Sequence, residues 1–364
     1  MPRNAVYVII LTCGMVYLFI IYHFSKGTHR PSMMGSKPKE NPRPTTCEEL
    51  TRKLPKTVPK QNHSQPKEFF DLSHNNFAYL DDIRYIHSPK DLCKRNSGKE
   101  KLILIVIMTD TLDSGHIFRR AIRATWANIT EHNGWSIRTA FILGISLNAD
   151  RMANISHESH QYRDIIQGSF SDGYNNLTSK TMTGYRWAQQ FCQHASLIMR
   201  ATHDTVVNIP QFVQISGELF DSEVTRIYLG EIYRNITHYK TGKWTFKCSI
   251  EWPNEIFSPY AAGSGFAVSM DLAIELNAMF CRTPFIFPDD NYIGELVDVL
   301  GIKPYPSINF QQFYIFNTMK FGRVKKRHIV VHFLRWDSKE VEEHPESLYK
   351  QIEMVNHALM HNNK

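Results

Sequence analysis

The sequence predicts an α/β fold with a largely parallel central sheet, and three neighbouring segments carry that prediction. Residues 102–108 (LILIVIM) are continuously apolar, which is typical of a strand covered by helices on both faces. A helix is expected through residues 118–126, and a second apolar strand follows at residues 139–145. Because a strand, a helix and a strand in this order join parallel neighbours, these segments predict a right-handed β-α-β unit.

Further elements continue this pattern along the chain. We expect strands at residues 196–199, 226–232 and 265–269, and helices around residues 181–193 and 271–279. In open sheets of this kind, ligands bind in a crevice at the carboxyl ends of the strands. The sequence contains no glycine-rich phosphate loop, which disfavours P-loop enzymes and dinucleotide-binding dehydrogenases.

The composition indicates a globular body, because 42% of the 364 residues are apolar and only 21% are charged. The net charge is +7, but Lys and Arg are dispersed and no basic ladder interleaved with aromatic residues appears. This dispersal argues against nucleic acid as a partner. An anionic small ligand, such as a nucleotide diphosphate, is the simpler explanation of the charge.

The N-terminal region has the layout of a signal-anchored membrane protein. Residues 1–4 form a short cytosolic tail, and residues 5–22 form an uncharged stretch about one bilayer long. No small-residue cleavage site follows this stretch, so retention as a membrane anchor is favoured over cleavage as a signal peptide. Residues 23–98 form a proline-rich stem and a transition segment, and residues 99–364 form the folded body.

The charges that flank the anchor do not decide its orientation, because Arg3 stands on one side and Lys26 and Arg30 stand on the other. The Asn-x-Ser/Thr glycosylation triplets all lie downstream of the anchor, which suits a body in the lumen of the secretory pathway. These triplets begin at Asn62, Asn128, Asn154, Asn176 and Asn235.

Cysteine usage fits an oxidising compartment without fixing the disulfide pairing. Beyond Cys13 in the anchor, no pair of cysteines has the spacing of a zinc finger. Some of the remaining cysteines are expected to pair in the lumen, and because their number is odd, at least one is free, buried or bonded to another chain. They are Cys47, Cys93, Cys192, Cys248 and Cys281.

One polar cluster follows the strand predicted at residues 196–199. This strand ends in Arg200, His203 and Asp204. An acid at the end of a buried strand is well placed to bind a divalent cation and, through it, a diphosphate. A capped turn explains the same residues equally well.

Two further polar clusters lie between apolar stretches nearer the C-terminus. Asp289 and Asp290 are adjacent carboxylates, of which one is expected to face the cleft while the other caps the following helix. Residues 258–266 contain Gly263 and Gly265, which allow the backbone to approach a ligand closely.

Five segments in this order and spacing resemble the signature series of the β-1,3-glycosyltransferases of glycosyltransferase family 31. The most specific segment is residues 162–180 (YRDIIQGSFSDGYNNLTSK). The others are residues 120–126 (RAIRATW), Lys243-Trp244, residues 259–266 and residues 289–294 (DDNYIG).

The resemblance implies a GT-A fold, in which a Rossmann-like, largely parallel sheet holds a UDP-sugar and a divalent metal, usually Mn²⁺, bridges protein and diphosphate. It implies an inverting reaction that moves a hexose, most often galactose, from a UDP-α-sugar to a glycan acceptor on a lipid or protein in β-1,3 linkage. Members are type II Golgi membrane proteins with a short tail, an anchor and a stem, which is the layout predicted for this chain.

The resemblance also implies roles for individual residues. Asp290 matches the second acid of the family's Glu-Asp-Val motif and is assigned as the general base that takes the proton of the acceptor hydroxyl. Asp289 is assigned to orient Asp290 or to bind acceptor hydroxyls, and Tyr174 is expected in the core. The residues assigned to the donor pocket are Arg120, Arg123, Asp172, Asn176, Lys180, Arg200, Gly263 and Gly265. An Asn176 that lines this pocket is not glycosylated, which leaves Asn62, Asn128, Asn154 and Asn235 as acceptors.

The chain departs from the family at residues 200–204 (RATHD), where the family usually has Lys-x-Asp-Asp-Asp. Asp204 can still coordinate the metal together with the diphosphate and a late histidine, for which His332 and His328 are candidates. His203 as a further ligand would make the metal site softer than an all-oxygen site. The loss of two acids weakens Mn²⁺ binding and, in the extreme, gives a metal-independent or inactive protein.

Two functions of different class therefore stay open. The first is an active β-1,3-galactosyltransferase, or a relative that transfers N-acetylglucosamine or N-acetylgalactosamine. The second is a non-catalytic relative that acts as chaperone or partner of an active transferase. The donor sugar, the acceptor and the assembly of the chain with itself or with other transferases do not follow from the sequence.

Overall fold

The computed structural model describes residues 11–12, 15–16, 43, 45–51, 78–94, 101–248, 255–310, 324–332 and 338–361. The chain divides into two compact units, residues 1–40 and residues 41–364. In the first unit, β1 (Leu11–Thr12) pairs antiparallel with β2 (Met15–Val16). The rest of the anchor predicted at residues 5–22, much of the stem and Asn62 lie outside the described residues. Among the helices that are described, none is long and apolar enough to cross a membrane.

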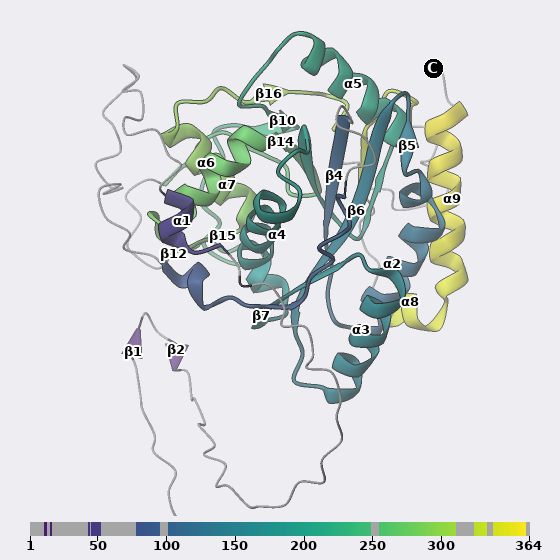
Figure 1. Cartoon of the computed structure of the whole chain (residues 1–364), viewed down its shortest axis with the longest axis horizontal. Coiled ribbons are helices and arrows are strands. Elements are labelled where there is room, and N and C mark those ends of the chain that lie inside the picture. Colours follow the sequence, from purple (N-terminus) through teal and green to yellow (C-terminus); the bar gives the residue numbers. More distant parts are fainter. Residues whose placement is uncertain are drawn as a thin grey trace, which may run out of the picture. The chain divides into compact units, whose positions relative to one another are not determined.

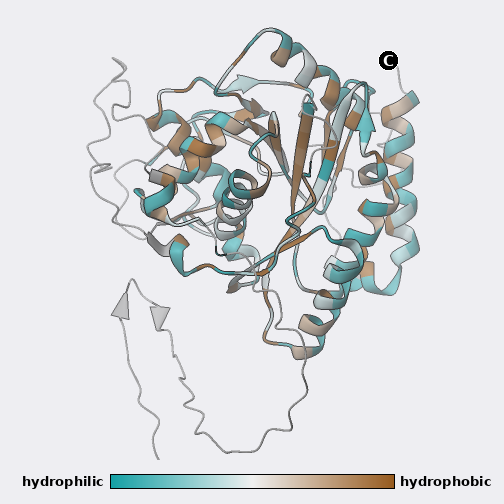
Figure 2. Cartoon of the chain, viewed as in Figure 1, coloured by the Kyte–Doolittle hydropathy of each residue, from teal (hydrophilic) through white to brown (hydrophobic). Residues whose placement is uncertain are grey.

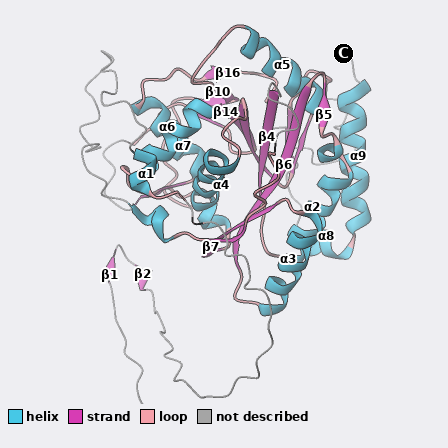
Figure 3. Ribbon diagram, in the orientation of Figure 1, coloured by secondary structure: helices cyan, strands magenta, loops and turns pink. Residues whose placement is uncertain are grey.

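The second unit is built around one mixed sheet, shown in Figures 1 and 3. Its centre is the strand β4 (Lys101–Met108), which pairs in parallel with β8 (Leu197–Thr202) on one side and β6 (Trp135–Ile145) on the other. The strand β7 (Ile165–Ser171) continues the parallel set beside β6. The prediction of a largely parallel sheet is therefore confirmed.

Short strands extend this sheet on both edges. On the β8 side, β14 (Gly265–Ser269) pairs antiparallel with β8, followed by β10 (Tyr228–Gly230) and β16 (Tyr305–Pro306). On the other edge, β3 (Tyr85–His87) pairs antiparallel with β7. The strand β5 (Glu131–His132) pairs with β6.

Three further two-stranded pairs of this unit lie outside the main sheet. They are β9 (Thr205–Val207) with β17 (Val330–His332), β11 (Ile232–Tyr233) with β13 (Tyr260–Ala261), and β12 (Lys247–Cys248) with β15 (Ile286–Phe287).

Helices cover both faces of the sheet, as Figure 1 shows. One layer consists of α2 (Asp113–Ala124), α3 (Ala149–Tyr162), α5 (Ile209–Asp221), α8 (Ser338–Glu343) and α9 (Pro345–His361). The other consists of α1 (Cys47–Thr51), α4 (Leu177–Phe191), α6 (Met270–Phe280) and α7 (Asp289–Val299). Short 3-10 turns lie at Ala78–Asp82, Trp126–Asn128 and Tyr174–Asn176.

The apolar run of β4 explains this three-layer arrangement. Ile105 and its odd-numbered neighbours enter the core under α2 and α9, whereas Leu104 and Val106 enter the core under α4 and α6. Successive side chains of a strand point to opposite faces, so a strand with apolar residues at every position requires a cover on both sides. Figure 2 shows the result as a hydrophobic sheet between helices with mixed surfaces.

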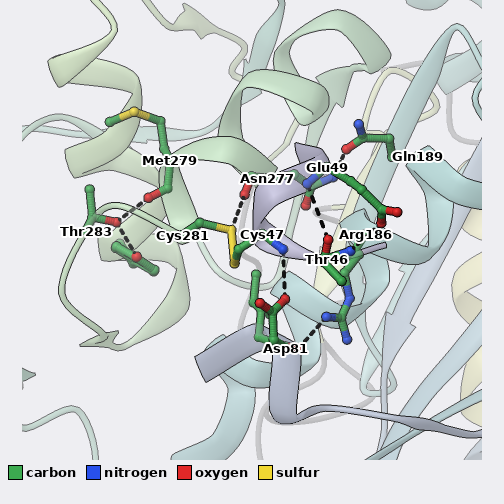
Figure 4. The surroundings of a disulfide bond; sticks show 12 residues. Thr46, Cys47, Glu49, Asp81, Arg186, Gln189, Asn277, Met279, Cys281 and Thr283 are labelled. Atoms are coloured by element: carbon green, nitrogen blue, oxygen red, sulfur yellow. Dashed lines mark hydrogen bonds between the residues drawn. A yellow bond between two sulfur atoms is a disulfide. The ribbon is translucent and has the colours of Figure 1, made fainter. Parts of the chain in front are cut away.

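Two disulfides attach the N-terminal part of this unit to its helices. Cys47 of α1 bonds to Cys281 at the end of α6, and Cys93 bonds to Cys192 at the end of α4. Figure 4 shows the first bond, where the Cys47 backbone amide donates to Asp81 Oδ1 at 2.7 Å. The two bonds use four of the cysteines beyond Cys13, and Cys248 takes part in neither.

Removal of the Cys47–Cys281 bond by the double variant Cys47→Ser, Cys281→Ser is expected to lower the free energy of unfolding by about 2–5 kcal/mol. The bond closes a chain segment with a sequence separation of 234, and this closure restricts the unfolded chain. Urea unfolding followed by circular dichroism measures the change, with Cys248→Ser as a control that keeps both disulfides. A double variant as stable as the control would contradict the prediction.

Candidate active site

Most of the sequence-predicted site residues, though not Arg120 and Arg123, gather where β4 and β8 end and where α4 and α7 begin. Met108 and Thr202 are paired in the last register position of the two parallel strands. The His203 backbone amide donates to the Met108 carbonyl at 3.0 Å, which brings the segment after β8 against the segment after β4. This is the edge of the sheet at which a parallel α/β fold binds its ligand.

Asp289, the first residue of α7, is fully engaged inside the protein. Its carboxylate accepts hydrogen bonds from Arg200 Nε at 3.1 Å and Arg200 Nη2 at 3.0 Å, and from Thr181 Oγ1 at 2.5 Å. The side chains of Asp289 and Arg200 are only 3% and 1% exposed. Both oxygens of this carboxylate are already bonded to a buried guanidinium, so Asp289 is suited to position its neighbours rather than to bind a substrate. Arg200 lies in the site as a partner of this acid.

Asp290 is the half-buried acid beside it and has the properties of a base near neutral pH. Its Oδ1 atom accepts from the Asn291 backbone amide at 2.9 Å. Burial and the negative charge of Asp289 raise the pKa of Asp290 to about 7, and the cation Arg200 opposes that rise. Gly263 forms the wall next to it, because a Cβ atom at that position would lie 2.7 Å from Asp290 Oδ2.

Three tyrosines surround Asp290 from other elements. They are Tyr174, Tyr228 and Tyr260, and burial followed by the charge of Asp290 raises the pKa of Tyr174 and of Tyr260. Tyr174 was expected in the core, but 39% of its surface is exposed, because it lies on a 3-10 turn at the mouth of the site. The tyrosines stay neutral and protonated, so Asp289 and Arg200 are the charged groups that set the ionisation of Asp290.

Asp289→Asn is expected to move the acid limb of the activity–pH profile to lower pH. Asp290 must be ionised to act as a base, so activity rises with pH through its pKa of about 7. Removing the negative neighbour favours ionisation of Asp290, which lowers that pKa. The profile of kcat/KM between pH 5 and 8 measures the shift, and Asp150→Asn on the exposed face of α3 is the control. An unmoved acid limb would contradict the electrostatic coupling of the two acids.

Lys180 connects α4 with the segment that follows β4. Its buried ammonium lies 2.6 Å from Asp172 Oδ1 and donates to the Thr109 carbonyl at 2.5 Å. Asn176 donates to the Ser171 carbonyl at 2.8 Å and so closes the turn before α4. Lys180 and Asn176, which the resemblance assigns to the pocket for the sugar donor, thus fix the backbone around the site.

The arginines of α2 are arranged differently from the prediction. Arg123 bonds to Glu158 at 2.7 Å and to Asp164 at 2.8 Å, and therefore joins α2 to α3 and the start of β7. Arg120 is exposed and lines a cavity of about 630 Å³ between α2 and α3.

Arg119, which was not predicted, reaches the site instead. Its Nη1 atom donates to the Asp110 carbonyl at 2.7 Å, while Nε and Nη2 bond to Glu158 at 2.8 and 2.7 Å. Arg119 and Arg123 are four residues apart on α2, and both bond to Glu158. Because Arg120 and Arg123 are three residues apart and are also neighbours on a helix, spacing alone does not distinguish Arg119 from Arg120.

Asp204 and His332 lie together, as the resemblance implied. His332 Nε2 is 3.1 Å from Asp204 Oδ2, and the buried atoms Asp204 Oδ1 and His332 Nδ1 have no hydrogen-bond partner among the described residues. This distance is that of an ion pair when His332 is protonated, so a divalent cation would bind here in place of the His332 proton and with two protein ligands. Among the described residues, no group of three or more His, Cys, Asp or Glu side chains is arranged to hold a metal.

The other histidines have different surroundings. The His203 ring stacks on Phe118 with centroids 4.5 Å apart, and its Nδ1 atom is 3.3 Å from Thr109 Oγ1. His328 is buried, its Nδ1 atom accepts from the Lys325 backbone amide at 2.9 Å, and burial lowers its pKa to about 4.

The remaining predicted residues lie on β14 and on the surface. A Cβ atom at Gly265 would lie 3.0 Å from Val330, so the role of this glycine is close packing of β14. The glycosylation acceptors Asn128, Asn154 and Asn235 are exposed.

The sequence of the chain is similar to those of known galactosyltransferases. The profile of the family described as galactosyltransferase matches residues 118–307, more than half of the chain. β-1,3-galactosyltransferase 5 of Mus musculus is 30% identical over 269 residues, which are 73% of this chain and 82% of the relative. β-1,3-galactosyltransferase 9 of Homo sapiens is 30% identical over 228 residues, which are 62% of this chain and 60% of the relative.

Solved structures resemble the chain only distantly. The bifunctional glycosyltransferase WbbM matches 72% of this chain and 53% of its own, with 10% identity and a TM-score of 0.38. The galactosyltransferase LgtC in complex with donor and acceptor sugar analogs matches 67% of this chain and 95% of its own, with 10% identity and a TM-score of 0.34.

The site and the sequence matches together define a glycosyltransferase, an enzyme that moves a sugar from a donor to an acceptor. The chain belongs to the galactosyltransferase family, which confirms the family predicted from its motifs.

Proposed function

We propose that this chain is an inverting, GT-A-type β-1,3-galactosyltransferase that uses UDP-galactose and a glycan acceptor. The observation that carries the proposal is Asp290, a half-buried acid with a pKa of about 7 at the carboxyl edge of the sheet. Its neighbour Asp289 is already bound by Arg200 and Thr181, so Asp290 is the acid of the pair that is available to a substrate. The curated relatives in the same family are named β-1,3-galactosyltransferases.

In the proposed reaction, Asp290 takes the proton of the acceptor 3-hydroxyl as that oxygen attacks the anomeric carbon of galactose. The bond between this carbon and the β-phosphate oxygen breaks, and its electron pair leaves with UDP. Attack from the side opposite UDP turns the α linkage of the donor into a β linkage. The rigid pair of Asp289 and Arg200 holds the backbone of Asp290 in place during this step.

The leaving diphosphate requires positive charge. Asp204 and His332 would hold a divalent cation, such as Mn²⁺, which supplies that charge when bound. Lys180 and Arg119 hold the backbone of Thr109 and Asp110 and so shape the wall beside the diphosphate.

We also propose that the body works in the Golgi lumen behind a type II anchor at residues 5–22. This proposal is supported by the apolar N-terminal sequence and the exposed glycosylation triplets at Asn128, Asn154 and Asn235. Epitope tags at both termini, tested for protease protection in intact and permeabilised Golgi vesicles, decide the topology.

A second candidate function is that of a non-catalytic partner of an active transferase. The observation that favours it is the replacement of two family acids by Thr202 and His203, which leaves Asp204 with one histidine. Such a partner would co-purify with an active transferase and raise its folding yield without binding a UDP-sugar.

A donor and acceptor screen separates the two functions. UDP release by the purified full-length protein is measured with UDP-galactose, UDP-N-acetylglucosamine and UDP-N-acetylgalactosamine, with and without Mn²⁺, and across neutral and charged acceptors. The enzyme proposal expects acceptor-dependent UDP release with UDP-galactose and a β-1,3-linked product by NMR. Absence of UDP-sugar binding to a folded protein would refute it and favour the partner function.

A further inference from the structure

We propose that the acceptor is an anionic glycan, one that carries a sulfate or a carboxylate near the sugar that is extended. The group that recognises this charge is the basic loop, which we define as residues 234–247. This inference rests on the proposed function, because it names the substrate class of the same site.

The basic loop carries an unbalanced positive charge. Arg234, Lys240, Lys243 and Lys247 are all exposed, and none of them forms an ion pair with a carboxylate among the described residues. The basic loop itself contains no acid; the nearest acids in the sequence are Glu231 before it and Glu251 and Glu255 after it, and the Glu255 carbonyl accepts from the His238 amide of the loop at 2.8 Å. Elsewhere in the site each cation has a carboxylate partner, as Lys180 has Asp172 and Arg200 has Asp289. The loop is therefore a local source of positive potential at the mouth of the site.

Two of these lysines lie against residues near the proposed base in sequence or in space. Lys243 Nζ is 4.3 Å from the centroid of the Tyr174 ring, and this ring contacts Phe287 with centroids 5.8 Å apart. Lys247 is the backbone partner of Phe287, three residues before Asp290, and its Nζ atom is 3.0 Å from Asn175 Oδ1. Both ammonium groups therefore lie on aromatic rings of the segments that border the proposed site, Lys243 on Tyr174 and Lys247 on Phe287.

The same loop also presents aromatic surface. Trp244 and Tyr239 are 47% and 42% exposed, and their ring centroids are 6.0 Å apart. Exposed aromatic rings beside unpaired cations provide an apolar contact for a sugar face together with a charge partner for its acidic substituent.

Matched pairs of acceptors test this inference. p-Nitrophenyl β-N-acetylglucosaminide is compared with its 6-O-sulfate, and p-nitrophenyl β-glucoside is compared with p-nitrophenyl β-glucuronide, which replaces one CH₂OH group by a carboxylate. Transfer by the full-length protein is measured for each. Binding of each acceptor to the Asp290→Asn variant in the presence of UDP is measured by calorimetry, independently of turnover.

We expect the charged member of at least one pair to bind more tightly and to have the lower KM. The pair that shows this preference identifies whether the recognised acidic group is a sulfate or a carboxylate. Lys243→Gln and Lys247→Gln are each expected to raise that KM about two- to fivefold with kcat and the donor KM unchanged. Added salt should reduce the preference, because exposed charges are screened. Lys350→Gln on α9 removes one exposed charge outside the loop and is expected to change nothing.

The outcomes distinguish this inference from the proposed function. Equal binding and equal kcat/KM for charged and neutral partners in both pairs would overturn the anionic acceptor, even if galactose transfer is efficient. A charge preference that survives both lysine substitutions would overturn the role of the basic loop. Loss of all UDP-sugar binding would refute the transferase, while the calorimetric comparison still decides whether the loop recognises anionic glycans.

Discussion

Asp290→Asn is expected to lower kcat for galactose transfer by about 10³-fold while UDP binding is retained. The substitution keeps the size of the side chain and removes its ability to take the acceptor proton at neutral pH, and general-base catalysis is worth about 10²–10⁴ in rate. In the native protein, the Asn291 backbone N–H donates a hydrogen bond to Asp290 Oδ1. The side-chain oxygen of an asparagine at position 290 can accept the same bond, so the start of α7 should keep its geometry. Single-turnover transfer and calorimetric titration with UDP measure the two quantities.

The matched control for this prediction is Asp150→Asn, which removes a carboxylate from the exposed face of α3. Normal turnover by Asp290→Asn would show that another group accepts the proton. Since Asp289 is occupied by Arg200 and Thr181, a water molecule or the diphosphate would then be the remaining acceptor. Loss of UDP binding together with turnover would instead place Asp290 in the donor pocket.

Much of the sheet could be predicted because its central strands are apolar on both faces. The strand predicted at residues 102–108 is β4, and the strand predicted at residues 265–269 is β14 with the same bounds. The strand predicted at residues 226–232 is divided between β10 and β11, because the chain leaves the main sheet after Gly230 to pair with β13. β7 was not predicted, since Gln167, Gly168 and Ser169 interrupt its apolar residues, and it is a strand through its pairing with β6.

The site was predictable in its residue types but less so in its contacts. The acids Asp289 and Asp290 were found from their motif, and the structure distinguishes them by their partners, which come from β8 and α4. Partners more than 80 residues away in the sequence leave no local pattern. The neighbour relation of Asp204 and His332 likewise depends on the pairing of β9 with β17.

Arg200→Met is expected to lower the free energy of unfolding by about 3–5 kcal/mol, the largest stability effect that the site offers. Arg200 supplies two of the hydrogen bonds to Asp289, whose side chain is 3% exposed. Without the guanidinium, the buried carboxylate keeps the hydrogen bond from Thr181 and must either protonate or draw in water. Urea unfolding at pH 7 measures the loss.

Two companion variants show whether the loss comes from an unpaired charge. Arg200→Lys restores the residue that the family usually has here and keeps the charge without the bidentate geometry, so its loss should be smaller. Arg200→Met combined with Asp289→Leu removes both charges and should recover much of the stability, because an apolar pair of similar volume often replaces a buried ion pair without cost. If the double variant were less stable than Arg200→Met, the site would depend on packing around Arg200 rather than on the pairing of charges. For the double variant we expect stability to recover and galactose transfer to stay low. The variant lacks the ion pair between Arg200 and Asp289, and this pair also positions Asp290.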